Sequence, residues 1–65
     1  MTQVPHFLTG RVYSLLLAPL NAHVVVRVGD IFLETFVPRS EGEKLRVGYE
    51  VIALASENGT TIRAL

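Results

Sequence analysis

The sequence predicts an all-β fold, a small five-stranded OB-like barrel with one short helical turn between its third and fourth strands. Three observations support this prediction. The chain has 65 residues, enough for a single domain, 1–65. Apolar and polar residues alternate with the period of a β-strand, and helical periodicity is almost absent. Turn-forming residues divide the chain into five strand-like runs, which is the outline of an OB-type barrel.

The first three strands are predicted at residues 7–17, 21–28 and 31–37, after a terminal arm at residues 1–6. Between the second and third strands, Gly29 and Asp30 tolerate the positive φ that a tight hairpin turn requires. The third strand ends before Pro38, which has no N–H group to donate to a sheet ladder.

Alternation gives these strands two faces. In the second strand, one face carries Ala22, Val24, Val26 and Val28, and the other carries His23, Val25 and Arg27. In the third strand, Ile31, Leu33, Thr35 and Val37 oppose Phe32, Glu34 and Phe36. In the first strand, Tyr13, Leu15 and Leu17 oppose Val12 and Leu16.

The remaining residues predict one helical turn and two further strands. Ser40 and Glu43 have the spacing of a capping box, which favours a single helical turn. The fourth strand is predicted at residues 49–55 and the fifth at residues 60–65. Asn58-Gly59 between them is a strong hairpin signal.

Several strands carry large apolar residues on both faces, which is more than a small barrel interior hides. A contiguous apolar patch on the surface of a soluble domain usually marks an interface. With no cysteines, disulfides are excluded as a means of stabilising so small a domain, which leaves association. We therefore expect a homo-oligomer whose interface contains Tyr13, Leu15, Val25, Phe32, Phe36, Ile52 and Leu54.

Residues that would indicate catalysis or metal binding are missing. No nucleophile elbow or phosphate-binding loop occurs. The two histidines, His6 and His23, are far apart in the sequence, and Glu41 and Glu43 lie beside Lys44, as in a solvated turn. We expect no enzyme, no metal site and no catalytic residues.

Charge and hydropathy limit the partners and the location. Six basic residues balance six acidic ones, so the chain has no net positive charge to attract nucleic acid. The apolar run at residues 15–20 is much shorter than the roughly 20 residues that span a bilayer. Residues 1–6 lack the basic and apolar regions of a secretory signal. A cytoplasmic location without a membrane span is expected.

Short motifs along most of the chain resemble those of TOBE domains and molbindins. Leu8-Thr9-Gly10-Arg11-Val12 and Leu20-Asn21-Ala22-His23-Val24 are similar to the "L-x-G-x-V" and "N-A-x-V" segments that open these domains. Val37-Pro38-Arg39-Ser40 is similar to their "V-T-x-x-S" segment. The run at residues 45–53 is similar to their "L-x-x-G-x-x-V-x-A" strand.

This resemblance implies an OB-like barrel that associates, often by exchanging strands, and holds a small oxyanion such as molybdate, tungstate or sulfate between subunits. It also implies a possible context as the regulatory domain of an ABC-transporter ATPase. The motif positions that carry over to an oxyanion site are Asn21, Ala22 and Ser40. Arg39 or Arg11 would supply positive charge, an assignment that rests on charge alone. No other cofactor is implied.

Two segments depart from the molbindin pattern. Residues 4–7 stand where molbindins carry "S-A-R-N", and Ala55-Ser56-Glu57 stands where they carry "K-A-S". The acidic side chain of Glu57 would repel an oxyanion, which weakens the anion-binding hypothesis more than the fold prediction.

Two alternatives from other classes remain open. The segments at residues 10–12 and 20–24 also fit nucleic-acid-binding OB domains of translation initiation factors, which need a basic track with exposed aromatic residues. The segment from residue 37 to 51 faintly resembles AbrB-type DNA-binding regulators, but that family has no place for the two strands before residue 30.

Overall fold

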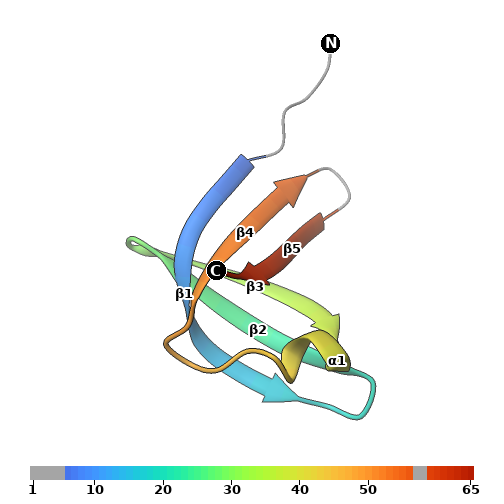
Figure 1. Ribbon diagram of the computed structural model, residues 1–65. Helices are drawn as coiled ribbons and strands as arrows, with labels where there is room; N and C mark the ends of the chain where they lie inside the picture. Colours follow the sequence, from blue (N-terminus) through green and yellow to red (C-terminus); the bar gives the residue numbers. More distant parts are fainter. Residues whose placement is uncertain (1–5, 57–58) are drawn as a thin grey trace.

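The computed structural model describes residues 6–56 and 59–65 (Figure 1). Within these residues the elements follow the predicted order of three strands, one short helix and two strands. Their bounds are β1 His6–Leu17, β2 Asn21–Val28, β3 Ile31–Pro38, α1 Arg39–Gly42, β4 Glu50–Ser56 and β5 Gly59–Ala64.

The strands form one antiparallel sheet in the order β3-β2-β1-β4-β5. The long strand β1 pairs with β4 along its first half and with β2 along its second half, so it joins the two parts of the sheet (Figure 1). The sheet curls until its two edges approach, and the hydroxyl of Thr35 on β3 donates to the carbonyl oxygen of Thr60 on β5 at 3.0 Å. The predicted small barrel, with a helical turn between the third and fourth strands, is confirmed.

Gly10 allows β1 to bend closely over β2. A Cβ atom at this position would collide with the backbone carbonyl oxygen of Arg27 and lie 2.8 Å from side-chain atoms of Val26 and Val28. Real Cβ atoms essentially never approach other heavy atoms this closely. Any side chain at residue 10 would therefore separate β1 from β2.

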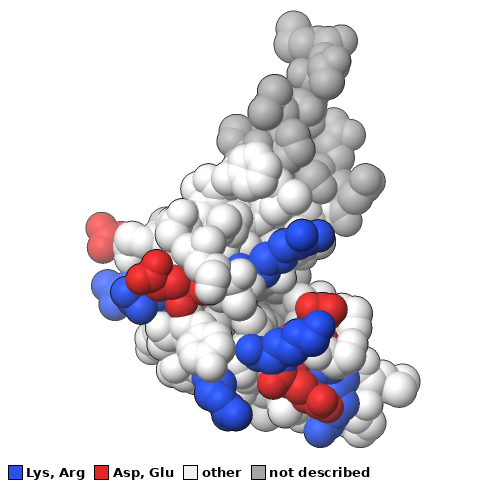
Figure 2. All heavy atoms as spheres, in the orientation of Figure 1, with Lys and Arg blue, Asp and Glu red and all other residues white. Residues whose placement is uncertain are grey.

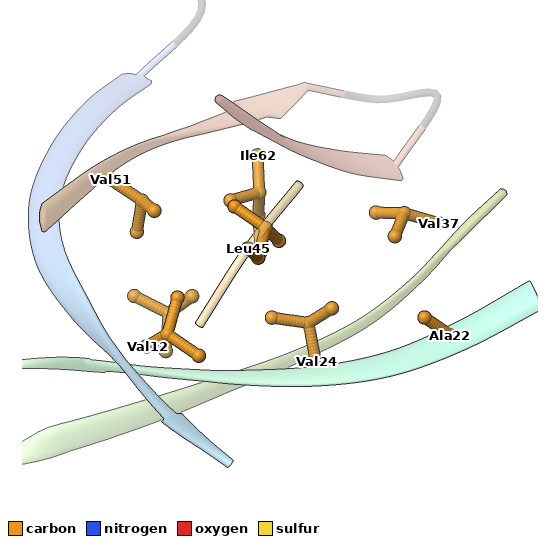
Figure 3. Packing of buried hydrophobic residues seen from close by; sticks show 8 residues of the cluster. Val12, Ala22, Val24, Val37, Leu45, Val51 and Ile62 are labelled. Atoms are coloured by element: carbon orange, nitrogen blue, oxygen red, sulfur yellow. The ribbon is translucent and has the colours of Figure 1, made fainter. Parts of the chain in front are cut away.

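The core is small and aliphatic. Among the described residues, the buried side chains include no polar or charged group, and they come from every strand and from the loop after α1 (Figure 3). The buried hydrophobic residues are Val12, Ala22, Val24, Val26, Val37, Leu45, Val51, Ala53 and Ile62. Ala22, Val24 and Val26 are fully buried, so the face that alternation assigned to these residues is the inward face of the second strand.

The predicted faces of the first strand are wrong beyond Tyr13. The pairing of β1 with β2 shifts register between Val12 and Ser14, which is a β-bulge. The bulge offsets the alternation, so Leu15 packs against the core. Leu16, predicted to share a face with Val12, is instead 66% exposed, whereas Val12 is 2% exposed.

The helix begins earlier than the capping-box spacing predicted. Its N-cap residue is Pro38 and no side chain caps it, so Ser40 lies inside the helix and not at its start. The carboxylate of Glu43 instead accepts a hydrogen bond from Nε of Arg39 at 2.8 Å. In the described part of the chain, no helix is long and apolar enough to cross a membrane.

Several strand boundaries differ from the predictions by one residue: β3 includes Pro38, β4 runs from Glu50 to Ser56 and β5 from Gly59 to Ala64. β1 begins at His6, which pairs with Ala55 of β4, so His6 is not part of a terminal arm. β4 and β5 pair up to Ser56 and Gly59. Of the residues that were used in the predictions, Glu57 and Asn58 lie outside the described ones.

Candidate functional site

The outward surface of β1, β2 and β3 carries the largest exposed side chains of the barrel. Directly paired residues of neighbouring strands point to the same face, so the register across these three strands defines this surface. We call it the aromatic face; it consists of Arg11, Tyr13, Ser14, Leu16, His23, Val25, Arg27, Phe32, Glu34 and Phe36.

Four rings on this face form two pairs. Tyr13 on β1 and Phe32 on β3 meet edge to face with ring centroids 4.8 Å apart, although β2 lies between their strands. His23 and Phe36, directly paired across β2 and β3, lie 5.0 Å apart. Despite these contacts, Tyr13, Phe32 and Phe36 remain 57%, 51% and 67% exposed. The rings are thus held against one another while much of their surface faces water.

The charges on the aromatic face are balanced. Nε2 of His23 lies 2.9 Å from a carboxylate oxygen of Glu34, and Nε of Arg27 donates to the carbonyl oxygen of Gly29 at 3.0 Å. Arg11, which pairs with Arg27 across β1 and β2, donates to the carboxylate of Glu50 at 2.8 Å. The surface therefore carries no continuous basic track.

The predicted interface residues separate into three groups. Tyr13, Phe32 and Phe36 are exposed and Val25 is partly buried, all four on the aromatic face. Leu15 is not part of that face, because the bulge turns it to the core. Ile52 and Leu54 are partly buried and line a groove that Phe36 of the aromatic face also borders.

This groove has a volume of about 840 Å³. One wall is formed by α1 and the end of β3, and the other by β4 and β5. Its lining is mostly apolar, and it also includes Glu41, Lys44 and Arg63. The sequence did not indicate it, because the groove arises where the two sheet edges approach without pairing. Phe7, 69% exposed, reaches the same groove and was not predicted.

The predicted oxyanion residues do come together at one corner of the barrel. Asn21 pairs with Pro38, and the N–H group of Arg39 donates to the carbonyl oxygen of Leu20 at 3.2 Å. Ser40 is exposed in α1, whereas Ala22 is fully buried.

The positive charge at this corner is already compensated. The guanidinium of Arg39 donates through Nε to Glu43 and through Nη1 to the carbonyl oxygen of Ala18, both at 2.8 Å. The backbone of Ala22 lies between β1 and β3, where the sheet ladders use its N–H and carbonyl groups. An anion bound here would compete with Glu43 for the arginine.

The wider surface repeats this balance of charge. On the side seen in Figure 2, basic and acidic groups lie beside one another around the hollow in the middle of the view, and no large area has a single sign. Among the described residues, no three histidine, cysteine, aspartate or glutamate side chains are grouped so as to hold a metal ion.

Comparison of the chain with protein-family models, with curated proteins and with solved structures finds no match.

Proposed function

We propose that this domain is a self-associating binding module whose copies cover one another's aromatic face. The observation that carries this proposal is the exposure of three aromatic side chains on one face, where Tyr13, Phe32 and Phe36 are each more than half exposed. Contiguous apolar patches on small domains usually mark interaction surfaces. Aromatic side chains are also enriched at protein interfaces, where they dominate the binding energy.

A second copy fits this face better than a highly charged partner does. The face carries the cations Arg11 and Arg27 and the anion Glu34, and Arg11 is already paired with Glu50, so the face has no strong preference for a polyanion or a polycation. Two copies that meet through the same surface offer Arg27 and Glu34 each a partner of opposite sign. The small core adds a reason for association, because a 65-residue domain is marginally stable alone.

The resemblance to TOBE domains and molbindins supports the same proposal from the sequence. It adds that the domain would assemble either as a homo-oligomer or as the regulatory domain of a transporter ATPase. Oxyanion binding at Asn21, Ala22, Arg39 and Ser40 stays a prediction of that resemblance, since Glu43 already neutralises Arg39.

Binding of single-stranded nucleic acid is the second candidate, and one observation favours it. OB-type barrels bind oligonucleotides on the face of strands 2 and 3, where exposed aromatic side chains stack on bases. Phe32 and Phe36 occupy that position here. Glu34 lies between them on the same strand, however, where it would repel the phosphate backbone. We therefore rank this function below self-association.

Sedimentation velocity over a range of micromolar concentrations tests the proposal. We expect the wild-type domain to dimerise or form larger species, and the double variant Phe32→Ser/Phe36→Ser to sediment as a monomer. The matched control is Leu20→Ser/Val47→Ser, which removes two equally exposed apolar side chains outside the aromatic face. A monomeric wild type throughout this range would contradict the proposal.

Two further arms separate the other candidates. Native mass spectrometry with and without molybdate, tungstate or sulfate reports an oxyanion bound to each oligomer. A gel shift with single-stranded RNA at low salt tests the nucleic-acid candidate. Binding that is lost in Phe32→Ser/Phe36→Ser while the wild type stays monomeric would favour nucleic acid over self-association.

A further inference from the structure

Two opposite charges of the aromatic face, Arg27 and Glu34, lie at similar distances from its centre, whereas Arg11 on the same face is paired with Glu50. Val25 pairs with Glu34 on the neighbouring strand β3, and Arg27 follows Val25 by two residues along β2. Neighbouring strands are about 4.8 Å apart, and two residues along a strand span about 6.7 Å. The direction from Val25 to Glu34 is therefore perpendicular to the strands, and the direction from Val25 to Arg27 is parallel to them.

This arrangement restricts how two copies can meet face to face about a twofold axis through Val25. An axis parallel to the strands would place Arg27 against its own copy in the partner. An axis perpendicular to the strands would place Glu34 against its own copy. Only a diagonal axis that passes between these two residues brings Arg27 of each copy over Glu34 of the other, so that both ion pairs form together.

The apolar residues agree with the same diagonal. Phe32 pairs with Arg27, and Leu16 pairs with His23, so Phe32 and Leu16 occupy opposite corners of the face with Val25 between them. Phe32, Val25 and Leu16 all lie along the diagonal axis, where each contacts the same residue of the partner. An apolar side chain at such a position meets another apolar side chain and not a like charge. Phe36 of one copy then falls over the β1 position that pairs with Arg27, which is Arg11, beside Tyr13 of the other copy.

We propose that two copies of this domain dock their aromatic faces crosswise, with Arg27 of each opposite Glu34 of the other. The strands of the two sheets then cross near 90°, which is one of the two common ways in which β-sheets pack. Crossing also suits two outwardly curved surfaces, because they touch at their centres. The inference rests on the self-association proposed above and adds its geometry.

Charge reversal tests this geometry. Arg27→Glu and Glu34→Arg each place like charges opposite one another at two symmetric positions, and we expect each to weaken dimerisation about tenfold or more at low salt. The double variant Arg27→Glu/Glu34→Arg restores both pairs and is expected to dimerise within about threefold of the wild type. Sedimentation velocity measures all four proteins.

Two charge reversals outside the aromatic face serve as controls for the change in net charge. Arg46→Glu and Glu41→Arg change the total charge by the same amounts and are expected to leave dimerisation unchanged. If the wild type associates and the double variant does not recover, the crosswise geometry is wrong, while self-association stands. If the wild type does not associate, both proposals fail.

Cross-linking gives a second, independent readout. The chain has no cysteine, so a single introduced cysteine is the only thiol. We expect Leu16→Cys, on the axis, to form covalent dimers with a short bismaleimide. Phe36→Cys lies away from the axis and, at a concentration at which sedimentation shows it to be as dimeric as Leu16→Cys, is expected to remain uncross-linked. Equal cross-linking of the two variants, or cross-linking of Phe36→Cys alone, would overturn the proposed axis.

Discussion

The inward and outward faces of β1, β2 and β3 differ sharply in the size of their side chains. Inside, β2 presents Ala22, Val24 and Val26, none of which has exposed surface. Outside, the same three strands present two phenylalanines and a tyrosine, each more than half exposed. A typical half-buried strand pattern places its bulk inside and polar residues outside.

This difference follows from the geometry of a small barrel. The interior of a barrel with few strands holds aliphatic side chains and has little room for aromatic rings, and the close approach of β1 to β2 at Gly10 narrows it further. Large side chains are therefore accommodated on the outer surface. Their exposure there, where they add nothing to the core, is the observation on which the proposed self-association rests.

The largest effect is expected where the interior has no spare room. We predict that Gly10→Ala destabilises the domain by about 3 kcal/mol, because the added Cβ would collide with the backbone of β2. Urea denaturation followed by circular dichroism measures the change. The control is Gly29→Ala, where the hairpin turn is open and only the positive φ of 59° opposes a side chain, at a cost of about 1 kcal/mol. Equal losses in the two variants would show that β1 moves away from β2 without penalty.

The same substitution, valine to alanine, is expected to have different effects on stability at two adjacent residues of β2, because one faces the core and the other faces outward. Val24→Ala leaves a cavity in the core and is expected to cost about 2 kcal/mol in unfolding free energy. Val25→Ala, on the aromatic face, is expected to cost about 0.5 kcal/mol or less in the dilute monomer while weakening self-association. Denaturation at low concentration and sedimentation at high concentration measure the two effects. If Val25→Ala changed stability as much as Val24→Ala, the outer face would be part of the core.

Much of the fold could be predicted because the relevant signals are local. Strict alternation along residues 22–28, a glycine at the first hairpin and Pro38 at the end of β3 each fix one feature of the barrel. The bulge after Val12 could not be predicted, because its position depends on how β1 is shared between β2 and β4. That single offset exchanged the environments of Leu15 and Leu16.

The candidate surface was predicted only in part, for the same reason. Phe32 and Phe36 were recognised because they oppose the inward residues of their own strand. Their contacts with Tyr13 and His23 depend on the register between strands, which no local pattern specifies. The pairing of Arg39 with Glu43, rather than with a ligand, depends on the start of α1, which the capping-box spacing misplaced.

A still smaller effect concerns the gap between the sheet edges. Thr35→Val keeps the shape of the side chain and removes its hydrogen bond to the carbonyl oxygen of Thr60, at an expected cost of about 1 kcal/mol. Thr61→Val, on an exposed position of β5, is the control and is expected to be neutral. Thermal unfolding of the two variants gives the comparison. A loss confined to Thr61→Val would mean that this hydrogen bond does not hold the barrel closed.

The smallest effect on stability is expected at the corner where the resemblance places an oxyanion. Glu43→Gln removes an exposed ion pair with Arg39 and is expected to cost about 0.5 kcal/mol or less. The same change frees the guanidinium, so any increase in melting temperature with molybdate, tungstate or sulfate, relative to chloride at equal ionic strength, should be larger in Glu43→Gln than in the wild type. Arg39→Gln should abolish that increase. An increase that is equal in all three proteins would place the anion elsewhere, because neither partner of the ion pair would then contribute to its binding.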